Sequence, residues 1–340
     1  MSGNEQKPMM VKESAEFISQ NAKHVSISDI GVEKAAESIL KGFKEEKFSL
    51  KSWKLNELNP QDANHPSTID WIFFADTLNF SFWSKNEQCK LTFHGKTYTG
   101  YWFLCAAMNR AIEEGFDILS PKFYSVVSMD TLKHIFRSDS GKEIPMLEER
   151  HKVLIETGRC LIEKFGGSFK NCVELCKNNA MNLLNLIIEN FPSYKDEALY
   201  EGKLVSFYKR AQILIGDIWA CFEGQGLGYF EDIHNLAIFA DYRIPQVLAH
   251  MKVLIYSEDL YQKLEKGIEM KNGDSEEVEI RGCTIWAVEL ILQRIKKLEV
   301  EGKDILFNSI LIDHYLWEHR RKHAEEMSST PFHRVRCIYY

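Results

Sequence analysis

The stretch "GVEKAAESILKGFKEE" at residues 31–46 shows the pattern that decides the fold class. Its apolar residues return every three or four positions, which is the spacing of one face of an α-helix. The residues on this stripe are Val32, Ala35, Ala36, Ile39, Leu40 and Phe43. Because polar and charged residues fill most of the other positions, the pattern predicts a helix that buries one face.

The same periodicity recurs along most of the chain. It predicts helices in "VKESAEFISQNA" (11–22), "EERHKVLIETGRCLIEKF" (148–165), "KNCVELCKNNAMNLLNLIIENF" (170–191) and "SFYKRAQILIGDIWACFEG" (206–224). The third segment is followed by Pro192 and the fourth ends in a Gly-rich stretch, and both features stop helices. We therefore expect a mainly α protein.

The clearest exception is "LNFSFWSKNEQCKLTFHGKTYT" at residues 78–99. Aromatic and polar residues alternate there, with turn residues near Lys85–Glu87 and at His94–Gly95, which predicts a small antiparallel sheet. A polar break, "KNGDSEEVE" (271–279), separates two later helices. Since the sequence shows neither a repeat nor a Pro/Ser-rich linker, we expect residues 1–340 to form a single helical domain with this β insertion.

Composition narrows the class of function. The chain has a net charge of −7, and its longest basic run is "RRKH" (320–323), which argues against binding a long nucleic-acid backbone. The first residues lack the apolar segment of a signal peptide, and no stretch approaches the length of a membrane span. The eight cysteines are spread through apolar segments, as is typical of reduced core thiols. We expect a cytoplasmic monomer that binds a small molecule.

One acid stands out in "NLAIFADYRIPQVLAHM" (235–251), where Asp241 lies inside an apolar run. Burying a bare carboxylate is costly unless it is paired, hydrogen-bonded or used. Asp241 is therefore the N-cap of the helix that follows, a partner for Arg243, or a catalytic group. The residues alone leave these alternatives open.

Two further stretches suggest binding groups. In "LIDHYLWEH" (311–319), Asp313 and Glu318 lie among aromatic residues, which suits a purine-like ligand that stacks on rings and donates N–H groups to an acid. The ordinary alternative is an amphipathic helix with exposed acids. In "FYKRAQ" (207–212), Lys209 lies at an expected helix start, where it suits a phosphate or is ordinary surface charge.

A zinc site is not expected. His319 and His323 are four residues apart, a spacing that suits a metal on a helix. However, the three residues between them are Arg320, Arg321 and Lys322, and their positive charge opposes a divalent cation. A solvated basic helix face is the better interpretation.

Taken together, the sequence resembles the family of queuosine salvage proteins, the queuosine 5′-phosphate N-glycosylases/hydrolases, over essentially its whole length. The blocks that carry the resemblance are "DTLNFSFW" (76–83), "GKTYTGYW" (95–102), "EKFGGSF" (163–169), "SFYKRAQIL" (206–214), "FADYRIPQVLAH" (239–250), "VEIRGC" (278–283) and "PFHRVRCIYY" (331–340). The resemblance implies hydrolysis of queuosine 5′-monophosphate to queuine and ribose 5-phosphate. It also implies a mainly helical fold similar to the helix-hairpin-helix DNA glycosylases, working without a metal or other cofactor.

The resemblance also implies roles for individual residues. Asp241 is similar to the catalytic carboxylate of the family, and Phe239 is similar to its base-stacking ring. In the C-terminal stretch, Asp313, His314 and Glu318 match the base-binding positions. Two positions depart from the family, which often has Tyr where this chain has His314 and His where "LNELNP" has Asn56. The contacts made by Asn56 and His314 are therefore expected to differ.

The chemistry of N-glycosidic bond cleavage agrees with the activity that the resemblance implies. Cleavage of an N-glycosidic bond builds positive charge at C1′, which a nearby carboxylate stabilises. A 7-deazapurine has no N7 to protonate, so the enzyme must depend more on that carboxylate and on hydrogen bonds to the departing base. Two rival functions remain open, which are a DNA-lesion glycosylase of similar fold and a non-enzymatic base-binding protein in tRNA modification.

Overall fold

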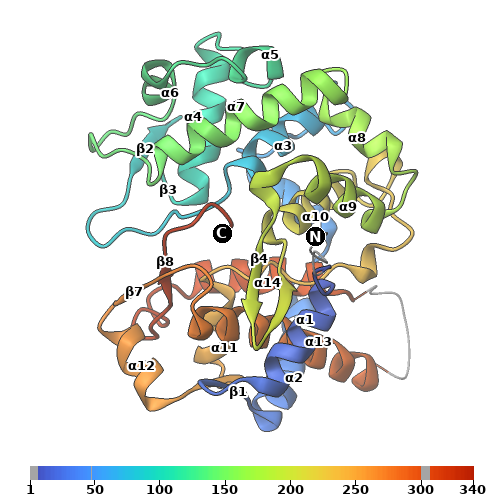
Figure 1. The fold of residues 1–340 in the computed structure, drawn as a ribbon, viewed down its shortest axis with the longest axis vertical. Coiled ribbons are helices and arrows are strands. Elements are labelled where there is room, and N and C mark those ends of the chain that lie inside the picture. The colour runs from blue at the N-terminus through green and yellow to red at the C-terminus, as the bar shows by residue number, and fades with distance from the viewer. Residues whose placement is uncertain (1–6, 47, 300–306) are drawn as a thin grey trace, which may run out of the picture.

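The computed structural model describes residues 7–46, 48–299 and 307–340, and it is mainly helical (Figure 1). The α-helices are α1 (Val11–Asn21), α2 (Asp29–Glu46), α3 (Thr68–Thr77), α4 (Tyr101–Glu113), α5 (Pro121–Tyr124), α6 (Met129–Ile135), α7 (Leu147–Lys164), α8 (Phe169–Leu175), α9 (Ala180–Asn190), α10 (Lys209–Cys221), α11 (Ile244–His250), α12 (Glu258–Glu265), α13 (Ser275–Leu298) and α14 (Ser309–Lys322). Short 3₁₀ helices are η1 (Leu50–Leu55), η2 (Pro192–Tyr194), η3 (Gly226–Gly228) and η4 (Ile233–Asn235).

The apolar stripes predicted from the sequence form the contacts between these helices. All the stripe residues of α2 are buried. The long helix α13 packs along α1 and α2, and α10 packs against α3, α9 and η1. Helix α10 is buried on nearly every residue, so it lies inside the protein rather than on its surface.

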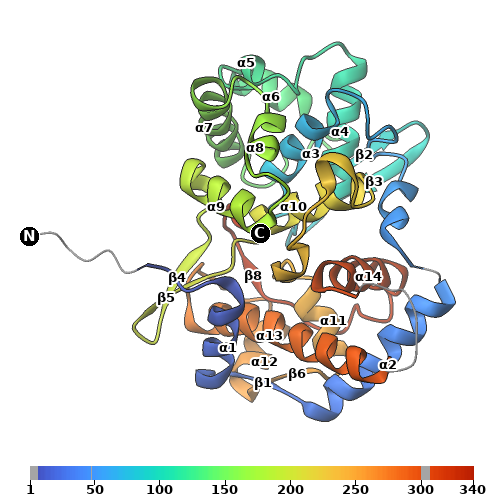
Figure 2. The same cartoon turned by 90° about the vertical axis from the view of Figure 1, so that its right-hand side faces the viewer.

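Helices α3 to α9 lie in one half of the molecule, and α1, α2 and α11 to α14 lie in the other (Figures 1 and 2). Helix α10 and the C-terminal segment lie between the two halves. Buried apolar residues from both halves belong to one connected core. This arrangement brings segments that are far apart in the sequence together at the start of α10.

The strands are short and form separate two-stranded pairs. They are β1 (Val25–Ile27), β2 (Lys90–Phe93), β3 (Lys96–Thr99), β4 (Glu197–Tyr200), β5 (Lys203–Ser206), β6 (Leu254–Tyr256), β7 (Glu269–Met270) and β8 (Arg334–Val335). The pairs β1–β6, β2–β3 and β4–β5 are antiparallel, and β7–β8 is parallel. The sequence indicated only the second of these pairs.

The predicted sheet over 78–99 is therefore right only in part. Strands β2 and β3 join through the expected turn at His94–Gly95, but residues 78–89 form no strand. Their polar groups are bonded elsewhere, because Ser81 N–H donates to the Tyr340 carbonyl and the Trp83 indole donates to the Val335 carbonyl. The expected turn near Lys85–Glu87 consequently joins no strands.

The single helix predicted over 170–191 is two helices, α8 and α9. Lys177 and Asn178 between them have positive φ angles of 48° and 60°, a left-handed conformation that ends a helix. Asn179 then begins α9, because its side chain accepts a hydrogen bond from Asn182 N–H. The apolar periodicity continues across the break, which is why the sequence pattern did not show it.

All eight cysteine thiols are free, and only Cys89 is not buried. This agrees with the expected core thiols. Within the described ranges, no helix is both long and apolar enough to cross a membrane.

Gly282 allows α13 to pack closely against α1. A Cβ built on Gly282 would lie 2.5 Å from Ile18 Cγ2 and 2.6 Å from Ile18 Cδ1. We expect Gly282→Ala to lower the free energy of unfolding by about 1–3 kcal/mol, measured by denaturant titration, because overpacking a rigid contact strains it. The double variant Gly282→Ala with Ile18→Ala should lose less free energy of unfolding than the sum of the losses in the two single variants. Strictly additive losses would contradict this account.

Candidate functional site

Asp241, the isolated acid in the apolar run, is half-buried and accepts hydrogen bonds at the start of α11. Its Oδ1 accepts hydrogen bonds from Arg243 N–H at 2.6 Å and from Ile244 N–H at 3.0 Å. The Arg243 guanidinium donates instead to Gln246 Oε1. The N-cap residue of α11 is Arg243, so the expectation that Asp241 is the N-cap is wrong, although Asp241 bonds the helix start from two residues before it. The side-chain pair with Arg243 is not formed. These bonds fix the carboxylate and leave Oδ2 without a hydrogen bond from the described residues.

Asp313 on α14 reaches the same segment from the other side. It is buried, and its Oδ2 accepts a hydrogen bond from Phe239 N–H at 3.0 Å. The exposed-acid alternative is therefore wrong for Asp313. Its pKa is raised to about 7, chiefly by burial and also by nearby Asp241, against the opposing effects of His314, the Phe239 N–H and Lys209.

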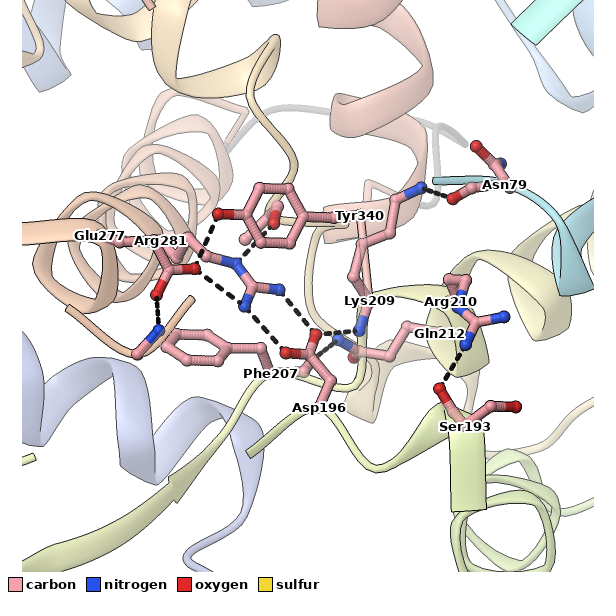
Figure 3. Close-up of polar contacts among 12 residues, drawn as sticks. Asn79, Ser193, Asp196, Phe207, Lys209, Arg210, Gln212, Glu277, Arg281 and Tyr340 are labelled. Atoms are coloured by element: carbon pink, nitrogen blue, oxygen red, sulfur yellow. Dashed lines mark hydrogen bonds and ion pairs between the residues drawn. The ribbon is translucent and has the colours of Figure 1, made fainter. Parts of the chain in front are cut away.

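Lys209, the first residue of α10, faces these acids from a third direction. Its side chain is buried, and Nζ donates to the Asn79 carbonyl at 3.1 Å (Figure 3). Burial lowers its pKa, although Asp241 and Asp313 are close enough to oppose the shift. The surface-charge interpretation is therefore wrong. Lys209 N–H already donates to Asp196 Oδ2 at 3.1 Å, so one backbone N–H group at the start of α10 already has a hydrogen-bond acceptor.

Two acids that the sequence analysis did not single out lie beside this group. Asp217 of α10 approaches His314, with Oδ1 and Nε2 3.4 Å apart. Asp76 of α3 is fully buried and accepts a hydrogen bond from the Asn79 side chain. Burial raises the pKa of Asp76 well above its usual value and Asp217 raises it further, against the effects of Asn79, Lys209 and Arg210. Burial therefore favours the neutral form of this carboxyl group over its charged form.

We call this group the buried charge cluster, and its members are Asp76, Lys209, Asp217, Asp241, Asp313 and His314. Burial tends to lower the pKa of His314, but the neighbouring Asp217, Asp313 and Glu318 outweigh it and the pKa is raised. A signal for Asp217 existed in the sequence, because it is an acid inside an apolar helix just as Asp241 is an acid inside an apolar run. Asp76 opens the "DTLNFSFW" block.

The remaining predicted residues lie at different distances from the cluster. The Phe239 ring is buried, its centroid is 5.9 Å from that of His314, and it packs over Gly216. Glu318 is about one-third exposed on α14. Asn56 makes local contacts, since its side chain accepts from Leu58 N–H, and none of its recorded contacts in the described chain reaches the cluster.

Two surface hollows lie away from the cluster. One hollow of about 270 Å³ is lined by residues such as His65 and Phe222, and another of about 490 Å³ by residues such as Glu37 and Leu298. Neither hollow is lined by the cluster. Over residues 7–46, 48–299 and 307–340, no three His, Cys, Asp or Glu side chains are placed to hold one metal ion. Buried charge is thus the feature that distinguishes this region.

The chain is similar along its length to proteins of one known family. The family model described as queuosine salvage protein matches residues 58–340. A mouse protein is 48% identical over 98% of this chain and 99% of its own length. A Schizosaccharomyces pombe protein is 38% identical (97% and 99%), and one from Sphaerobacter thermophilus is 34% identical (90% and 91%). All three are named queuosine 5′-phosphate N-glycosylase/hydrolase.

The raised pKa of Asp313 predicts a pH-dependent stability. The folded protein holds this proton up to about pH 7, whereas the unfolded chain releases it near 3.8, the ordinary pKa of an aspartate side chain. Ionisation therefore destabilises the fold as pH rises between these values. Relative to the parent, Asp313→Asn should gain about 2–3 kcal/mol in free energy of unfolding between pH 5 and pH 8. Denaturant titrations at both pH values test this, and a pH-independent difference would refute it.

Proposed function

The chain belongs to the queuosine salvage protein family, and from this we propose that it hydrolyses the N-glycosidic bond of queuosine 5′-monophosphate. The products are queuine, which is recovered for tRNA modification, and ribose 5-phosphate. The observation that carries the proposal is the near-full-length similarity to relatives named for this activity. The buried charge cluster supports it, because it supplies a fixed carboxylate beside a buried cation.

Asp241 is the proposed catalytic carboxylate. As the C1′–N bond breaks, its electron pair moves to the base and positive charge builds on the ribose ring. A carboxylate held by two backbone N–H groups stabilises that charge without having to reorganise. It also accepts a proton from the water that attacks C1′.

Asp313, His314, Glu318 and Phe239 are proposed to bind the base. An ionised Asp313 accepts hydrogen bonds from the N1–H and exocyclic amine of a guanine-type edge, which adenine does not offer. Glu318 is suited to the cationic amine or the diol of queuine. Phe239 provides an aromatic surface, and His314 provides an imidazole beside it. Asn56 is assigned to this set by its family position alone.

Lys209 is proposed to bind the substrate's 5′-phosphate. Its buried ammonium already lies among acids, so an incoming phosphate would compete with Asp241 and Asp313 for its charge. The same cation can instead act on the reacting centre by holding Asp241. The two roles differ in what they predict for a substrate without phosphate.

We further propose a single domain over residues 1–340, with a helical fold similar to the helix-hairpin-helix DNA glycosylases. The protein is proposed to be a cytoplasmic monomer that binds neither polymeric nucleic acid nor membrane, in line with its net charge of −7. A DNA-lesion glycosylase would bind duplex DNA tightly and with strong salt dependence. A base-binding protein without catalysis would bind queuine and release none from the nucleotide.

The role of Asp241 is tested by Asp241→Asn. We expect queuine release to fall by about 10²-fold or more, because a charge directed at the transition state is lost. Binding of free queuine should remain within about threefold, since the amide keeps an oxygen acceptor for the start of α11. Single-turnover assays and queuine titrations measure both quantities. Near-parental turnover would remove Asp241 from the reaction.

The role of Lys209 is tested by Lys209→Met, with the exposed Lys170→Met as the matched control. If Lys209 binds the phosphate, KM for the nucleotide should rise by about 10–100-fold while the free nucleoside is affected much less, since a charged hydrogen bond contributes about 1.5–3 kcal/mol. Equal losses for both substrates would instead assign Lys209 to the chemistry. Lys170→Met should change neither value.

A further inference from the structure

Arg281 on α13 is a buried cation that the proposed function does not use. Its Nη1 and Nη2 donate to the two carboxylate oxygens of Asp196 at 2.8 and 2.6 Å (Figure 3). The guanidinium also lies between the rings of Phe207 and Tyr340, with Cζ 4.1 Å from each centroid. Contacts on both faces and along one edge hold this group in a single orientation.

From this position Arg281 reaches both candidate reactive residues through one intermediate group each. Asp196 Oδ2, which it binds, accepts the backbone N–H of Lys209 at 3.1 Å. Its Nε donates to the carbonyl of Ala240, the residue before Asp241, at 2.9 Å. One rigid guanidinium therefore fixes the backbone at Lys209 and at Asp241 together.

The C-terminal segment closes the same network. The Tyr340 hydroxyl donates to Glu277 Oε1 at 2.8 Å, and Arg281 Nη1 lies 3.4 Å from that oxygen. The Tyr340 carbonyl accepts from Ser81 N–H at 2.9 Å. Two residues before Ser81, the Asn79 carbonyl receives the Lys209 ammonium. The backbone and the side chain of Lys209 are thus both held by groups linked to Arg281.

We propose that Arg281 is a positioning residue that sets the separation of Lys209 and Asp241, and this inference rests on the proposed function. The contact is poorly suited to a purely stabilising role, because a well-packed apolar residue commonly serves stability as well as a buried ion pair does. A positioning role fits better, because a displacement of about 1 Å at a reacting group can cost about 10²-fold in rate. Lysine cannot reproduce the arrangement, since it lacks the planar fork that binds two oxygens and a carbonyl at once.

The first experiment compares Arg281→Lys with Glu279→Gln, a second buried polar change on the same helix. Glu279 accepts from His24 N–H and Lys23 N–H and from the Tyr200 hydroxyl, on the side away from the cluster. Arg281→Lys should lower kcat by about 10–100-fold with KM changed less than about threefold. Glu279→Gln should lower the thermal midpoint and leave kcat near that of the parent. If both variants lose kcat in proportion to stability, the positioning role is overturned.

The second experiment places Arg281→Lys in the Asp241→Asn background, where the catalytic carboxylate that Arg281 positions is already lost. Residues that act as a unit have non-additive effects, so the kcat loss from Arg281→Lys should shrink to less than about threefold there. An undiminished loss overturns the proposal. If Lys209→Met and Asp241→Asn both turn over normally, the proposed site has failed instead. If those two variants are impaired while Arg281→Lys is not, only the positioning inference fails.

Discussion

Arg281 and Asp196 form an ion pair at the point where three distant parts of the chain meet. Asp196 precedes β4, Arg281 lies near the start of α13, and the Tyr340 ring covers the pair from the C-terminal segment. Burial works to lower the pKa of Arg281, but the charge and hydrogen bonds of Asp196 outweigh it, so the pKa is raised and the side chain stays charged. The start of α10 and the residue before Asp241 both depend on this pair for a hydrogen-bond partner.

Two other buried arginines donate to backbone carbonyl oxygens instead of to a carboxylate, and burial lowers the pKa of both. Arg150 donates to the carbonyls of Leu78 and Phe80, and Arg210 donates to the carbonyls of Thr77 and Ser193. These carbonyls belong to η2 and to the irregular backbone around the end of α3. They accept no hydrogen bond within a helix or a sheet. Non-repetitive segments at the centre of the protein are thus stabilised by side chains that supply the missing donors.

Local sequence patterns predicted the parts of the fold that depend on local interactions. The stripe of α2, the helix α10 (Lys209–Cys221, predicted over 206–224) and the β2–β3 hairpin all follow from neighbouring residues. The break at Lys177–Asn178 was missed because left-handed backbone leaves apolar periodicity intact. The pair β1–β6 was missed because its strands have three residues each and lie far apart in the chain, so their register comes from tertiary packing.

The site was predictable where a residue stands out from its neighbours or matches a family motif. Asp241, Phe239 and Asp313 lie together as expected, joined by the Phe239 N–H bond to Asp313. The burial of Lys209 was not predictable, because its partners Asn79 and Asp196 come from other segments. Arg281 was inside a quoted motif, but only the fold reveals that it contacts Asp196 and Ala240.

The protonation of the cluster has a consequence for the proposed reaction. Asp76 and Asp313 both have raised pKa values, chiefly because burial disfavours their charged forms. A substrate with a cationic amine, and a transition state with positive charge at C1′, favour the ionised forms of nearby acids. Binding and loss of a proton from Asp313 are therefore linked, and by reciprocity the substrate binds more tightly as pH rises through about 7. A bound cation thus favours the ionised form of Asp313, whereas burial in the free protein favours its protonated form.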